Sequence, residues 1–211
     1  MRTKLQVAMD MVSPEELMRL TGEIENYVDI LELGTPYLLK YGTGVIEEIK
    51  KEAPGLEILC DTKIMDAGYY EANEIFQRGA DYVTVLAAAD SATVEECVKA
   101  ARENGKKVMA DMICVMDLES QIRRLEELGV DILAVHTGVD QQALGRTPLG
   151  DLIELKRRCK KSGVAVAGGI TVDTVESYLQ NAPDILIVGS GIVNAQEPIK
   201  QAQYFYQSIN R

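Results

Sequence analysis

The stretch Tyr82–Asp111, YVTVLAAADSATVEECVKAARENGKKVMAD, contains a short β-branched run, a longer amphipathic run and a second short run. Tyr82–Leu86 and Lys107–Asp111 are predicted strands. Asn104-Gly105 between them predicts the end of a helix, because glycine readily adopts the left-handed conformation that closes a last helical turn. The stretch therefore predicts two strands joined by a helix, the usual connection between parallel strands.

The same unit recurs along the whole chain. Six further runs are predicted strands: Lys4–Met9, Val28–Leu33, Leu56–Cys60, Asp131–Val135, Val164–Ala167 and Asp184–Val188. A segment with helical periodicity follows each strand, as in Pro14–Ile24, where Ser13 is the predicted N-cap. This strict alternation predicts an α/β fold, a (β/α)8 TIM barrel forming a single domain over residues 1–211. An open doubly wound sheet is the alternative.

Composition and charge exclude several classes of function. Of the 211 residues, 46% are apolar and 26% are charged, which is typical of a globular protein. The net charge is −11 without a concentrated basic patch, so neither nucleic acid nor an anionic membrane surface is an expected partner. We expect no membrane span and no export leader. The four cysteines form no C-x-x-C pair, so we expect a cytoplasmic location rather than a disulfide or zinc framework.

Polar residues stand where the predicted strands end, and active sites of such barrels lie at that end. These residues are Asp10, Glu32, Asp61, Lys63, Asp111 and His136. Each of them alone could simply cap a loop or a helix. Together, several carboxylates at one mouth would repel one another unless a cation neutralised them. Oxygen ligands of this kind suit Mg²⁺ or Mn²⁺.

Glycine-rich turns follow the last two predicted strands. Gly168-Gly169 follows the seventh strand, and Gly189-Ser190-Gly191 follows the eighth. Glycines let backbone N–H groups approach an anion closely, and barrels of this kind commonly hold a phosphate after these two strands. Either turn alone could simply be a loop in which glycine allows the chain to change direction. Their joint placement predicts a phosphorylated small molecule as the substrate.

An ordered set of motifs resembles the orotidine-5'-phosphate decarboxylase suprafamily from about Leu5 to the final helix. The most specific motif is Asp61-Thr62-Lys63-Ile64-Met65-Asp66, which resembles the D-x-K-x-x-D signature of that suprafamily. The others are Ala8-Met9-Asp10, Leu31–Thr35, Val135–Gly138, Ala167–Ile170 and Val188–Ile192. The ordered set is much more specific than any single motif.

Within the suprafamily, the chain is most similar to aldehyde-lyases that join D-ribulose 5-phosphate to formaldehyde. A near relative, the decarboxylase of 3-keto-L-gulonate 6-phosphate, typically has arginine at the positions of Val139 and Ser190. It also has threonine in place of Ala167 and glutamate in place of Asp111. This chain departs from the decarboxylase at all four positions, although activities in the group overlap. A phosphosugar-binding barrel without turnover is a second alternative. The presence of Glu32, Asp61, Lys63 and His136 disfavours it, because such a barrel would lose the metal and base positions.

The resemblance also implies roles for the polar residues. Glu32 and Asp61 would hold Mg²⁺, with Mn²⁺ as a possible substitute. Lys63 would add positive charge beside a 1,2-enediolate. His136 would remove the C1 proton of ribulose 5-phosphate, after which the enediolate would attack formaldehyde to form D-arabino-3-hexulose 6-phosphate.

Three acidic residues complete the set that the resemblance implies. Asp10 would orient substrate hydroxyls or Lys63, and Asp111 would belong to the same catalytic group. Asp66, the last residue of the D-x-K-x-x-D motif, would reach into the site of a neighbouring subunit. The resemblance therefore implies a homodimer.

Overall fold

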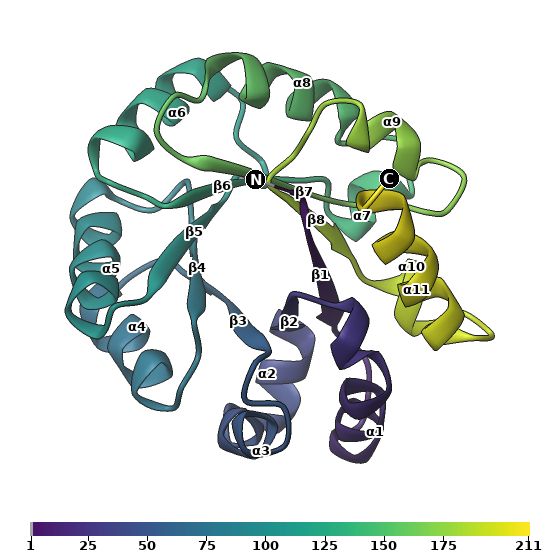
Figure 1. Ribbon diagram of the computed structural model, residues 1–211. Coiled ribbons are helices and arrows are strands. Elements are labelled where there is room, and N and C mark those ends of the chain that lie inside the picture. The colour runs from purple at the N-terminus through teal and green to yellow at the C-terminus, as the bar shows by residue number, and fades with distance from the viewer. Residues whose placement is uncertain (1) are drawn as a thin grey trace.

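The computed structural model describes residues 2–211 and shows a closed barrel of eight parallel strands surrounded by helices (Figure 1). The strands follow one another in chain order, and the last pairs with the first. They are β1 Lys4–Met9, β2 Ile30–Leu33, β3 Glu57–Ile64, β4 Tyr82–Leu86, β5 Lys107–Asp111, β6 Ile132–His136, β7 Gly163–Ala167 and β8 Ile185–Val188. The predicted (β/α)8 barrel is confirmed, and the open sheet is excluded.

Helices cover the outside of the barrel, and their ends follow local signals in the sequence. In the first helix, Ser13 accepts a hydrogen bond from the backbone N–H of Glu16, and Pro14 follows the cap. Gly105, in the left-handed conformation, ends the longest helix. The helices are α1 Pro14–Ile24, η1 Glu25–Tyr27, α2 Thr35–Tyr41, α3 Val45–Glu52, α4 Gly68–Gln77, α5 Ser91–Asn104, α6 Leu118–Glu127, α7 Val139–Gln142, α8 Leu149–Arg158, α9 Val175–Leu179, α10 Ser190–Val193 and α11 Pro198–Ile209.

Two strands differ from the predicted runs by more than one residue. β2 begins at Ile30 rather than Val28; Val28 packs between the strands and the surrounding helices, whereas Ile30 lies inside the barrel. β3 continues to Ile64 instead of ending at Cys60, because its pairing with β4 resumes beyond a break in register. The predicted boundaries of the other strands agree with the structure within one residue.

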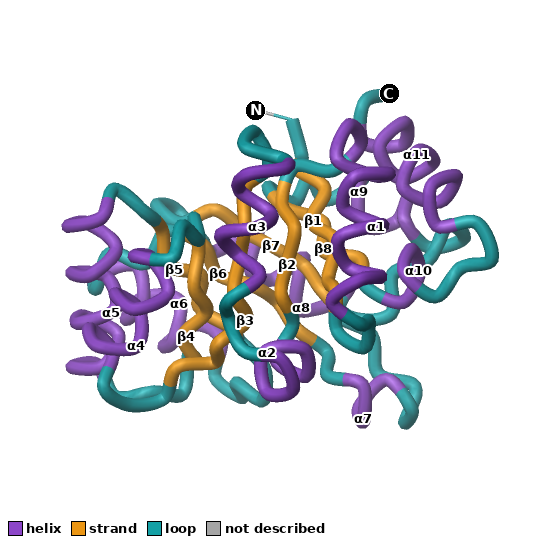
Figure 2. Tube along the Cα trace, turned by 90° about the horizontal axis from the view of Figure 1, so that it is seen from below, coloured by secondary structure: helices purple, strands orange, loops and turns teal. Residues whose placement is uncertain are grey.

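The alternating side chains of the strands build two apolar layers. One layer lies between the strands and the surrounding helices. The other fills the inside of the barrel with residues such as Ile30, Leu59, Met109 and Ile185. Above this inner layer, the carboxyl ends of the strands present polar side chains. Figure 2 shows the barrel from the side, with both termini at one end and α7 at the other, beyond the carboxyl end of β6.

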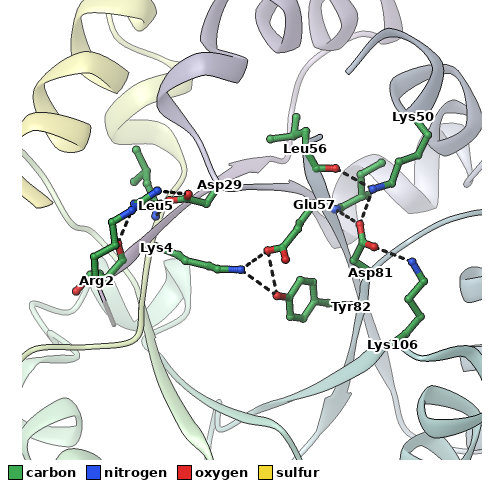
Figure 3. A network of polar contacts seen from close by, with 12 residues as sticks. Arg2, Lys4, Leu5, Asp29, Lys50, Leu56, Glu57, Asp81, Tyr82 and Lys106 are labelled. Carbon is green, nitrogen blue, oxygen red and sulfur yellow. Dashed lines mark hydrogen bonds and ion pairs between the residues drawn. The ribbon is translucent and has the colours of Figure 1, made fainter. Parts of the chain in front are cut away.

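Four aspartates fasten pairs of strands at the amino-terminal end of the barrel. Each stands immediately before an even-numbered strand and accepts, through Oδ2, a backbone N–H from the preceding odd-numbered strand at 2.8–2.9 Å. The aspartates are Asp29, Asp81, Asp131 and Asp184. Each also has a basic partner, and Figure 3 shows Asp29 with Arg2, and Asp81 between Lys50 and Lys106. Each of these aspartate clamps thus joins two neighbouring strands at the end of the barrel opposite the polar cavity.

None of the helices in residues 2–211 combines the length and the apolar character needed to span a lipid bilayer.

Candidate active site

The carboxyl ends of the strands open into a cavity of about 920 Å³. Its walls include all the residues predicted for the site except Asp66. They are Asp10, Glu32, Asp61, Lys63, Asp111 and His136, with Gly168, Gly169, Gly189, Ser190 and Gly191. Asp66 is exposed on the loop after β3, outside this cavity, and accepts the backbone N–H of Ala67. Its role in a neighbouring subunit stays a prediction.

A bulge in β3 brings Asp61 and Lys63 side by side. The pairing register shifts in this part of the strand, so that the three residues Asp61–Lys63 lie opposite the single residue Thr84 of β4. Lys63 has a φ of 47°, in the left-handed region that a residue with a side chain rarely adopts. The result is a direct contact of 2.6 Å between Lys63 Nζ and Asp61 Oδ2.

A chain of charged groups runs from β3 across the cavity to β6. Lys63 Nζ lies 3.0 Å from Asp111 Oδ2, and the same oxygen lies 3.0 Å from His136 Nδ1. Burial alone would lower the pKa of Lys63, but the charges of Asp61 and Asp111 raise it above its ordinary value. Lys63 therefore stays protonated throughout the physiological range.

The contact with Asp111 sets the tautomer of His136. Burial opposes ionisation of Asp111, but the hydrogen bond from His136 and the charges of His136 and Lys63 hold its pKa below the ordinary value. Asp111 also accepts the backbone N–H of Ile113 at 2.9 Å, which fixes its orientation. Because an ionised carboxylate only accepts, Nδ1 of neutral His136 carries the proton and Nε2 keeps a basic lone pair.

Two more carboxylates lie on the side of the cavity formed by β1 and β2. Glu32 is 8% exposed and accepts a hydrogen bond of 2.6 Å from Gln6 Nε2. Burial, followed by the negative charge of Asp61, raises the pKa of Glu32 and also that of Asp10. The carbonyl oxygen of Gln6, Oε1, is buried without a hydrogen-bond partner. Negative charge and oxygen acceptors are thus in excess on this side.

These donors fit a divalent cation bound by oxygen. Within residues 2–211, no three side chains of His, Cys, Asp or Glu are grouped closely enough to hold a metal by themselves. Mg²⁺ does not need such a cage, because it commonly keeps several waters and binds one or two carboxylates together with substrate oxygens. Glu32 and Asp61 can supply that pair of carboxylates, and a cation would offset the repulsion that raises the pKa of Glu32.

We expect Glu32→Gln to stabilise the metal-free protein at alkaline pH. Since the folded-state pKa of Glu32 is raised, the folded state holds a proton that the unfolded chain has already lost, and stability falls as pH rises through that interval. Glutamine removes the charge from this buried position. With a chelator present, the Tm of Glu32→Gln should exceed that of the parent protein by at least about 2–4 °C at pH 9 and should differ little from it at pH 5.

Glu52→Gln, at an exposed position in α3, is the matched control and should not reproduce this pH dependence. An equal shift for Glu32→Gln at both pH values would contradict the interpretation.

The two glycine-rich turns meet between the carboxyl ends of β6 and β1, across the barrel from β3 and β4. Gly168 and Gly169 have φ values of 122° and 68°, which only glycine adopts without strain. At Gly191, a Cβ would come within 2.7 Å of the backbone oxygen of Ile170, so glycine is needed for the two turns to approach each other. Within residues 2–211, the backbone amides of Gly169, Gly189, Ser190 and Gly191 donate no hydrogen bond. They remain free to bind an anion.

Three functional residues were missed by sequence reasoning. Gln6 contacts Glu32, while Thr35 and Thr84 donate hydrogen bonds of 2.8 Å to the two carboxylate oxygens of Asp61. A signal was present for Gln6 and Thr84, because each is a polar residue inside an otherwise apolar strand. Their partners depend on the pairing of neighbouring strands, which the local pattern does not reveal.

The fold and this cavity define a (β/α)8-barrel enzyme whose site combines carboxylates, a lysine and a histidine with two glycine-rich turns. Residues 3–205 match the family described as "Orotidine 5'-phosphate decarboxylase / HUMPS family". The chain belongs to this family.

Curated relatives and solved structures narrow the comparison. The chain is 42% identical over 206 residues to the 3-hexulose-6-phosphate synthase of Bacillus subtilis (strain 168), covering 98% of each sequence. A crystal structure of 3-hexulose-6-phosphate synthase from Salmonella typhimurium is 47% identical, with a TM-score of 0.96 over 99% of each chain. A crystal structure of KGPDC from Streptococcus mutans is 27% identical, with a TM-score of 0.92 over 99% of this chain and 98% of that one.

Proposed function

We propose that this protein is an aldehyde-lyase that condenses D-ribulose 5-phosphate with formaldehyde to give D-arabino-3-hexulose 6-phosphate. The observation that carries the proposal is a single cavity that brings together a histidine base, a protonated lysine and free backbone amides. The relatives in Bacillus subtilis and Salmonella typhimurium, named for this activity, support it.

Each end of the substrate has a complementary wall. The turns at Gly168-Gly169 and Gly189–Gly191 bind the phosphate through backbone N–H groups. The ketose end then extends toward Lys63 and His136, where C1 is deprotonated.

The chain's own residues can carry the protons of the reaction. Nε2 of His136 takes a proton from C1, and Asp111 stabilises the imidazolium that forms. Lys63 stabilises the negative charge that develops on the sugar oxygens. The C1 carbanion then forms the new carbon–carbon bond with formaldehyde, and the new alkoxide takes the proton from His136. Asp10 orients the substrate hydroxyls from the end of β1.

Glu32 and Asp61 are the proposed holders of Mg²⁺, with Mn²⁺ as the alternative ion. When bound, the cation would act as a Lewis acid toward substrate oxygens.

The proposed protein is a homodimer located in the cytoplasm. A homodimer would bring Asp66, exposed here, to the site of its partner. The four cysteines are all free thiols, which suits the reducing cytoplasm.

We expect Ser190→Asp to weaken substrate binding specifically. Ser190 lies at the rim of the cavity between Gly189 and Gly191, so a carboxylate there would face the phosphate dianion. Ser190→Asn adds nearly the same volume without the charge and is the matched control. Relative to that control, KM for ribulose 5-phosphate should rise about tenfold or more, which corresponds to about 1.4 kcal/mol. Inhibition by inorganic phosphate should weaken in parallel. Equal KM values for the two variants would place the phosphate elsewhere.

The proposed reaction is tested by assaying the purified protein with ribulose 5-phosphate plus formaldehyde and, separately, with 3-keto-L-gulonate 6-phosphate. Formation of hexulose phosphate at the higher kcat/KM supports the proposal. Faster release of CO₂ from 3-keto-L-gulonate 6-phosphate would indicate the decarboxylase activity instead of the proposed one. The decarboxylase is the second candidate because the chain is also similar to KGPDC. Binding of phosphosugars with turnover of neither would indicate a non-catalytic barrel.

A further inference from the structure

We propose that Thr84 is a positioning residue, which holds the bulge of β3 so that Asp61 and Lys63 face the cavity side by side. This inference rests on the proposed function only in assigning Asp61 and Lys63 to the reaction. The placement of the two residues by Thr84 is a separate, structural statement.

Thr84 is bound to all three residues of the bulge. Its Oγ1 donates a hydrogen bond of 2.8 Å to Asp61 Oδ1. The same oxygen accepts the backbone N–H of Lys63 at 2.9 Å, and the backbone oxygen of Thr84 accepts the hydroxyl of Thr62 at 2.8 Å. One residue of β4 therefore replaces the regular strand pairing that the bulge interrupts.

The arrangement requires a hydroxyl group at position 84. A hydroxyl can donate to a carboxylate and accept from an N–H at the same time, whereas the isosteric valine can do neither. Thr84 is only 4% exposed, so water has little access to replace the lost bonds. Removing the hydroxyl would leave the N–H of Lys63 and one oxygen of Asp61 without this partner.

The hydroxyl of Thr84 also helps to hold the backbone of Lys63 in an unfavourable conformation. The left-handed φ of 47° at Lys63 is costly and persists only where surrounding contacts hold it. Once the N–H of Lys63 is released, β3 can relax toward a regular conformation. Such a shift would move Lys63 Nζ away from the 2.6 and 3.0 Å contacts that fix it between Asp61 and Asp111.

The test compares Thr84→Val and Thr84→Ala with Thr84→Ser, which keeps the hydroxyl. For valine and alanine we expect kcat to fall about 10- to 100-fold, the usual cost of losing a group that orients an active-site ligand. KM should change little, because the phosphate turns lie on the other side of the cavity. Thr84→Ser should restore most of kcat. Thr21→Val, a buried threonine in α1 that donates to the backbone oxygen of Leu17, is the matched control and should lower Tm without changing kcat.

Amide hydrogen exchange provides a readout that does not depend on turnover. The N–H of Lys63 should exchange faster in Thr84→Val and Thr84→Ala than in the parent and in Thr84→Ser. If valine fails to fold, the alanine and serine variants decide the question. Parent-like kcat in folded Thr84→Ala, or equal losses in Ala and Ser, would overturn the proposal, as would unchanged exchange of Lys63. If the parent protein itself lacks the proposed activity, the exchange experiment still decides the role of Thr84.

Discussion

Replacement of Lys63 with alanine is expected to lower kcat by about 10²-fold or more, the scale of a lost electrostatic group in an active site. The ammonium group lies between Asp61 and Asp111, and no other lysine or arginine within residues 2–211 lines the cavity. Without it, negative charge developing on the substrate would meet uncompensated carboxylates. The barrel should remain folded, because Lys63 is only partly buried and belongs to neither apolar layer.

Steady-state kinetics and circular dichroism of the variant check both parts of this prediction. Lys106→Ala is the matched control, since Lys106 also pairs with an aspartate, Asp81, at the opposite end of the barrel. It should keep the parent kcat. His136→Ala should lose at least about 10²-fold, as expected for a general base. Near-native turnover in Lys63→Ala or in His136→Ala would remove the role assigned to that residue.

Removal of divalent cations is expected to abolish turnover. Glu32, Asp61 and Asp10 are three carboxylates on one side of the cavity. Burial, and then the negative charge of Asp61, raises the pKa of Glu32 and that of Asp10. A further negative charge on the substrate would be strongly disfavoured there without a cation. Activity should disappear in excess EDTA and return with Mg²⁺ or Mn²⁺.

Titration with Mg²⁺ identifies the residues that hold the ion. Glu32→Gln should require a much higher Mg²⁺ concentration for half-maximal activity, whereas Glu52→Gln, at an exposed position on α3, should match the parent. Full turnover of the parent protein in excess EDTA would show that the reaction does not depend on a metal.

The barrel could be predicted from sequence because its signals are local. Strand runs, an N-cap such as Ser13 and helix-ending glycines such as Gly105 each act within a few residues. The shared placement of Asp10, Glu32, Asp111 and His136 also followed, since parallel strands place their carboxyl ends at one mouth.

What escaped prediction depends on contacts between strands. The bulge that extends β3 past Cys60 involves Thr84 of the neighbouring strand, and no pattern within residues 57–64 predicts it. The entry of β2 at Ile30 is set in the same way, by the bonds of Asp29 to β1. The role of Asp66 at the site of a neighbouring subunit stays a prediction, and in this chain Asp66 lies exposed on the loop after β3.

The aspartate clamps described for the amino-terminal end have a consequence for how the chain assembles. Each joins residues only 20 to 24 positions apart, so the loop it closes is short and the entropy lost on closing it is small. The clamps therefore link four pairs of strands that are neighbours along the chain, β1–β2, β3–β4, β5–β6 and β7–β8. Joining β8 to β1 instead brings together residues as distant as Thr3 and Pro183. In kinetic terms, most strand pairing can proceed as rapid local steps, and the slow search is confined to closing the ring.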